Sequence, residues 1–156
     1  MDRYVYVSSD ESDSYFPENE VYKFKVHLES PLFLTGFWKV GLVEFRAKQS
    51  KSKLIKTNGP LYIFTDLCKE SIVNGVQQPL LRRLEKNVKD GWSHLLDPVI
   101  YLPVKRKELL EFEVYIKNED ESLPSFLQSP LHLTLTFKRY PFYADYEAIL
   151  FIHPQR

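Results

Sequence analysis

The chain of 156 residues has a single cysteine, Cys68, only five glycines and no net charge. One thiol excludes an intrachain disulfide framework and a thiolate-based metal site, and it suits a reducing compartment. So few glycines leave no GxxxxGK[ST] or GxGxxG motif, which excludes nucleotide binding through those phosphate loops. Because 21 basic and 21 acidic residues cancel, no overall field steers the protein toward nucleic acid or an anionic membrane.

Long apolar runs are also missing. The start, MDRYVYVSSD, lacks the apolar core of a signal peptide. No run approaches the roughly 20 residues that a membrane helix needs. We therefore expect an intracellular protein without a membrane partner.

Groups arranged for catalysis are equally scarce. The four histidines do not recur at the spacing of metal ligands, and neither HExxH nor GxSxG occurs. Cys68 follows an expected strand near Asp66, an environment that does not activate a thiol. The acidic clusters at 10–13 and 118–121 are typical of solvated loops. We expect no enzyme, no cofactor and no metal site.

Strand patterns dominate what is present. Apolar and polar residues alternate strictly in 21–29, 110–117 and 131–138, and this period of two puts one set of side chains in a core. The side chains expected in the core are Tyr22, Phe24, Val26 and Leu28 of the first segment, Leu110, Phe112, Val114 and Ile116 of the second, and Leu131, Leu133, Leu135 and Phe137 of the third.

Further strands are expected at 3–8, 37–46, 61–66, 71–76 and 98–104. The segment 79–89 has apolar residues at helical spacing, but Pro79 and the short apolar run favour a strand at 80–85. Turn residues separate these segments, as in TNGP, NG and DG. About eight short antiparallel strands without a helix predict an all-β sandwich, jelly roll or barrel.

The stretch GFWKVGLVEF (36–45) predicts a central strand of this domain. Trp38, Val40 and Leu42 alternate toward one face, and Gly41 permits a bend or the close approach of another segment. None of its side chains is a nucleophile or a metal ligand, which indicates a structural role.

Two other segments have open interpretations. The basic stretch 46–56 is either a solvated loop, a contact with an acidic protein or a contact with nucleic acid; the last is disfavoured because no aromatic residue is interleaved for base stacking. Its cations are Arg46, Lys48, Lys51, Lys53 and Lys56. The aromatic tail 141–156 is either an extra strand or short helix on its own core, or an arm that docks on a neighbour. Its large apolar side chains include Phe142, Tyr143, Tyr146 and Phe151.

The order of several phrases resembles the penton, or minor capsid, protein of Polinton (Maverick) elements and of adintoviruses. These phrases are YFPEN (15–19), LESPLFLTGFWKVGLVEF (28–45), LYIFTDL (61–67), PLLRRL (79–84) and LTLTFKRY (133–140). The most specific are the YFPEN turn and the G-x-W-x-V-G-L-x-E block. The region 85–101 departs from the pattern.

The resemblance implies a single jelly roll over residues 1–140 that forms a homopentamer at the fivefold vertices of an icosahedral capsid. The double-jelly-roll major capsid protein would surround it, which places the protein in the virion. A closed ring needs two different complementary surfaces on each subunit. Outward residues that are not plain charge are the candidates, namely Tyr115, His132, Thr134, Thr136 and the tail aromatics. The alternative is a β-sandwich binding module for glycan or protein, with an exposed Trp92 as its platform.

Deleting residues 141–156 tests the two interpretations of the tail. If the tail is a docking arm, the shortened chain stays folded by circular dichroism but assembles less in light scattering. If it belongs to the core, the shortened chain unfolds.

Overall fold

The structure is a computed structural model that describes residues 2–50, 59–89 and 91–140. The predicted tail 141–156 and the cations Lys51, Lys53 and Lys56 lie outside these ranges. The strands are β1 (Asp2–Ser8), β2 (Lys23–Phe33), β3 (Trp38–Gln49), β4 (Leu61–Thr65), β5 (Ser71–Val73), β6 (Val76–Gln78), β7 (Leu80–Leu84), β8 (Gly91–Leu95), β9 (Leu102–Pro103), β10 (Glu108–Asn118) and β11 (Leu127–Arg139).

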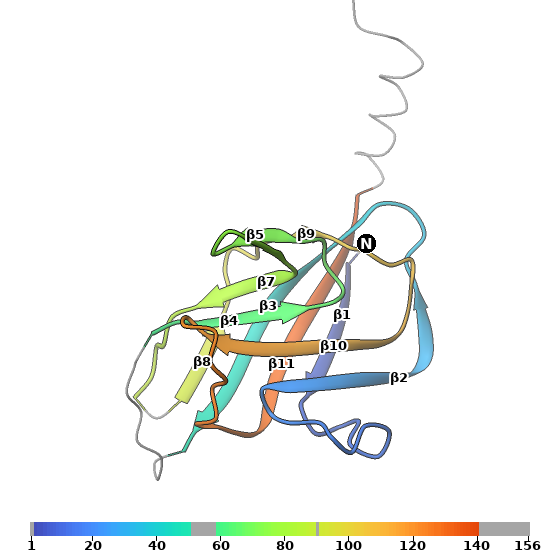
Figure 1. Ribbon diagram of the computed structural model, residues 1–156. Coiled ribbons are helices and arrows are strands. Elements are labelled where there is room, and N and C mark those ends of the chain that lie inside the picture. The colour runs from blue at the N-terminus through green and yellow to red at the C-terminus, as the bar shows by residue number, and fades with distance from the viewer. Residues whose placement is uncertain (1, 51–58, 90, 141–156) are drawn as a thin grey trace, which may run out of the picture.

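These strands form two main antiparallel sheets (Figure 1). The first sheet has the order β1-β11-β3-β8, with β9 added beside β3, and the second has the order β2-β10-β4-β7. A small hairpin, β5-β6, stands apart from both. No helix occurs in the described ranges, so the prediction of an all-β protein is confirmed, and the arrangement is consistent with a β-sandwich.

The inner faces of the two sheets share one apolar core. Phe45 and Phe137 enter it from the first sheet and Phe24 and Phe112 from the second, each at most 2% exposed. Burying a side chain of this size contributes about 1.5–3 kcal/mol relative to leaving it in water. The core therefore supplies the main force that holds the sheets together.

Most of the expected strands are present, with different ends. The segments at 21–29, 110–117 and 131–138 are β2, β10 and β11, and all three are longer than predicted. Segment 71–76 is wrong as one strand, because Asn74 and Gly75 adopt positive φ and turn the chain into the β5-β6 hairpin. Segment 98–104 is a strand only at Leu102–Pro103, and β8 was not predicted.

Leu110 was expected in the core but is 40% exposed. The pairing of β10 with β2 shifts between Leu109 and Glu111, and such a β-bulge changes which face the next residue occupies. Leu109 is consequently the buried residue at this point. Strict alternation in sequence could not reveal this shift, in which residues 28–31 of β2 stand opposite Leu110.

The expected inward set of β3 is confirmed, since Trp38, Val40 and Leu42 are at most 7% exposed. Gly41 faces the other way and lies under a crossing segment. A Cβ atom at Gly41 would clash with Val99 Cγ1 and lie 2.8 Å from the Ile100 carbonyl oxygen. The predicted close approach at this glycine is thus made by residues 99–100.

We expect Gly41→Ala to destabilise the fold by about 1–3 kcal/mol, because the added methyl overpacks this contact. Urea unfolding measures the change. Val99→Ala alone should cost little, since Val99 is half-buried; combined with Gly41→Ala it should restore part of the loss. Unchanged stability of Gly41→Ala would show that the crossing segment does not pack against β3.

Candidate functional site

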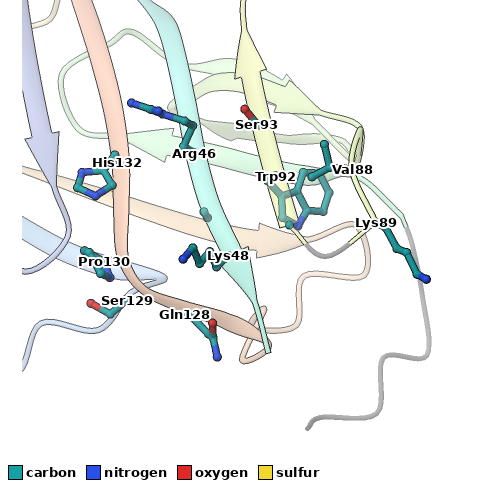
Figure 2. A pocket seen from close by; sticks show the side chains of 12 residues that line it. Arg46, Lys48, Val88, Lys89, Trp92, Ser93, Gln128, Ser129, Pro130 and His132 are labelled. Atoms are coloured by element: carbon teal, nitrogen blue, oxygen red, sulfur yellow. The ribbon is translucent and has the colours of Figure 1, made fainter. Parts of the chain in front are cut away.

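The outer face of the first sheet brings together two residues of the basic stretch and one of the predicted interface residues. Arg46 and Lys48 lie two residues apart on β3, and His132 on β11 is the direct cross-strand partner of Arg46 (Figure 2). Arg46 and Lys48 thus belong to an exposed strand face and not to the loop that their composition indicated. A single patch now includes one of the proposed interface residues and two of the proposed basic ones.

A hollow of about 930 Å³ lies beside this patch, and we call it the basic groove. The ends of β3, β8 and β11 form it, and its titratable side chains are Arg46, Lys48, Lys89 and His132. No carboxylate is among the described residues that line it. Within the described part of the chain, these four side chains form one ion pair, between Arg46 Nε and the Glu44 carboxylate at 3.7 Å. An exposed pair of that length adds little stability, and the titratable side chains that line the groove among the described residues are basic.

Thr134 and Thr136 were expected at the surface, and this is wrong. They alternate with core residues and pair with Tyr6 and Tyr4 of β1, but they are only 5% and 1% exposed. Both sit in the middle of the sheet, and the segment that crosses Gly41 passes beside Thr136, which pairs with that glycine. Period-2 alternation indicates the direction of a side chain but not what covers it.

Tyr115 lies on the second sheet and is half-buried by its own chain. Its ring stacks on Phe64 at a centroid distance of 4.9 Å, and Lys117 Nζ lies 5.7 Å from its centroid. Burial raises the pKa of the Tyr115 hydroxyl. The structure does not bring Tyr115 together with His132, because the two residues belong to different sheets.

Trp92 was expected as an exposed platform, but it is 2% exposed and belongs to the core. It pairs with the inward-facing Ala47. The interpretation as a ligand platform on this tryptophan is therefore wrong. The chemically similar residues that are exposed are Tyr4 and Tyr6, at 54% and 74%.

The sequence argument missed several large apolar side chains at the surface. Tyr4 and Tyr6 lie on β1, one edge of the first sheet, and Leu95 lies on β8, the opposite edge. Leu95 is 78% exposed. The alternation of RYVYVS did contain the signal for the tyrosines, because Val5 and Val7 occupy the other face; Leu95 had none, since β8 was not predicted.

The described residues contain no group of three or more His, Cys, Asp or Glu that could hold a metal ion. They also contain no helix long and apolar enough to cross a membrane. No family model matches the chain, and no curated protein matches it.

Cys68 is fully buried, and burial raises the pKa of its thiol to about 11. Since the thiolate is the reactive form, we expect Cys68 to resist thiol reagents at pH 8 in the native protein and to react quickly in urea. Between pH 9 and 11 the unfolded state releases this proton more readily than the native state, so the thiol makes stability fall with rising pH. Cys68→Ala should remove that part of the pH dependence. Rapid labelling of the native protein would contradict the assignment.

Proposed function

We propose that this chain is a single jelly roll that forms a homopentamer at the fivefold vertices of an icosahedral capsid, where it contacts a double-jelly-roll major capsid protein. The protein would then be a structural component of the virion and not an enzyme. The sequence phrases that resemble penton proteins of Polinton elements and adintoviruses support this assignment, as does the order of the strands.

The strand order is the observation that carries the proposal. Eight strands remain when the β5-β6 hairpin and the short β9 are set aside. Numbered one to eight along the chain, they pair first with eighth, second with seventh, third with sixth and fourth with fifth. This is the pattern of one long hairpin that folds over itself to give two four-stranded sheets, 1-8-3-6 and 2-7-4-5. A jelly roll has this wrapping.

A ring requires two different surfaces on each subunit, and the first sheet has large apolar side chains exposed at two different edges. In a ring with heterologous contacts, one surface of each subunit meets a different surface of the next. Tyr4 and Tyr6 at the β1 edge supply one such surface, and Leu95 at the β8 edge supplies the other. Tyrosine is well suited to the contact, because it buries a large area with few rotatable bonds.

The proposal predicts a mass near five times 18.5 kDa in solution, measured by light scattering after size-exclusion chromatography. Tyr6→Ser combined with Leu95→Ser should give a folded monomer, since both apolar contacts are weakened. Leu123→Ser is the matched control, because Leu123 is also exposed, at 54%, but lies on neither edge. A wild-type monomer at high concentration, also in the presence of the major capsid protein, would contradict the proposal.

The second candidate function is a binding module for glycan, and the exposure of Tyr4 and Tyr6 on one sheet face favours it. Aromatic side chains stack on the apolar faces of sugars in the same way that they bury other apolar surface. Isothermal titration with oligosaccharides tests it. Binding that Tyr4→Ala and Tyr6→Ala abolish, in a protein that stays monomeric, would favour this function over the ring.

A further inference from the structure

We propose that the basic groove binds an acidic peptide segment of a partner protein, one that carries an apolar side chain among its carboxylates. The groove is built within one chain, so this proposal goes beyond the assembly of a ring and does not depend on it.

The groove exists because β11 bulges away from β3. Gln128 pairs with Lys48 and His132 pairs with Arg46, so residues 129–131 stand opposite the single residue Ala47. The displaced backbone is held from the other side: Leu131 N donates to Ser9 Oγ at 2.9 Å and Ser9 N donates to the Leu131 carbonyl at 2.9 Å. Ser9 is 3% exposed. The hollow is therefore fixed by hydrogen bonds before any ligand arrives.

The apolar part of the lining consists of Ala47, Val88, Trp92 and Pro130. Trp92 is buried in the core, whereas Val88 is 42% exposed. Val88 therefore offers an accessible apolar side chain to a ligand. The volume of about 930 Å³ falls at the upper end of the range of roughly 300–1,000 Å³ typical of ligand sites. There is room for an apolar side chain together with neighbouring peptide atoms.

The cations stand on two sides of this apolar lining. Figure 2 shows Arg46 and Lys48 next to each other on β3, and Lys89 across the groove beside Val88 and Trp92. A ligand in the groove therefore lies near cations from two segments of the chain, β3 and the segment before β8. Charge-assisted hydrogen bonds to carboxylates are about twice as strong as neutral ones, and the planar guanidinium of Arg46 can bind a carboxylate with two bonds. Charge complementarity thus favours an anionic ligand, and carboxylates are the anionic groups of an unmodified peptide.

The free edge of β8 is blocked against the addition of a strand. Asn87 lies over this edge, where its side-chain amide donates to the Ser93 carbonyl, and Ser93 N donates to Asn87 Oδ1 at 3.1 Å. An incoming peptide consequently cannot rely on backbone pairing at this point of the sheet. Its affinity must come from the side chains of the groove, so reversing their charge should remove binding.

Nucleic acid fits this surface less well. Recognition of a single strand combines a row of cations with aromatic rings on which bases stack. Two aromatic rings line the groove among the described residues: Trp92 is buried, and only the imidazole of His132 is exposed. Its lysine and arginine side chains come from two segments, Arg46 and Lys48 from β3 and Lys89 from the segment before β8.

The test uses a short fluorescein-labelled peptide of Glu and Asp residues around one central Leu. Its binding to the full chain is followed by fluorescence anisotropy at low and high salt. We expect binding that weakens with salt, because the contacts are ionic. A peptide with Gln and Asn in place of the acids should bind about tenfold more weakly or less, as expected when charge-assisted contacts are lost.

Lys48→Glu combined with Lys89→Glu should lower the affinity for the acidic peptide by about tenfold or more. Lys69→Glu combined with Lys107→Glu is the matched control, since these two lysines are exposed but do not line the groove; it should bind as the wild type does. Equal melting temperatures show that the variants are folded. Equal binding by both double variants, or no preference for the acidic over the neutral peptide, would overturn the proposal. Tighter binding of a single-stranded oligonucleotide than of the acidic peptide would also overturn it, in favour of nucleic acid.

Discussion

The pairing of β3 with β11 is the interaction on which the rest of the structure depends. They are the two longest strands, with 12 and 13 residues, and they lie side by side in the middle of the first sheet. Their inner residues, such as Leu42 and Leu135, are completely buried in the shared core. Their outer residues include His132 and Arg46 of the basic groove. A slip of one residue would exchange these two faces, so the same register determines both the core and the proposed binding surface.

Period-2 alternation predicted the strands whose two faces differ most, and it failed where the ladder is irregular. The strand predicted at 131–138 is confirmed, because the buried residues Leu131, Leu133 and Leu135 recur without interruption. The prediction for Leu110 was wrong because the pairing of β10 with β2 is irregular there: residues 28–31 of β2 stand opposite Leu110 alone. Thr134 and Thr136 lie on the predicted outer face but are buried, and Thr136 pairs with Gly41, over which residues 99–100 cross. Propensity and alternation are local properties, whereas bulges and coverage depend on the whole fold.

The candidate site was likewise predicted only in part: local pattern identified its residues, but the fold determined how they come together. Composition identified Arg46 and Lys48 as a basic feature, and alternation identified His132 as outward-facing. Only the register of β3 with β11 places them next to each other, and only the displaced residues 129–131 open the groove beside them. The exposure of Leu95 could not be predicted from the sequence, because the apolar pattern of β8 is too short to be recognised as a strand.

Under the proposed function, the protein would act through its shape and its surfaces. The exposed Tyr4, Tyr6 and Leu95 at the two edges of the first sheet suit the proposed association with copies of itself, and the basic groove suits the proposed acidic partner. Negative-stain electron microscopy of the purified protein tests the central claim most directly. The proposed vertex subunit predicts class averages of rings with fivefold symmetry, whereas single sandwiches or rings of another symmetry at the same concentration would contradict it.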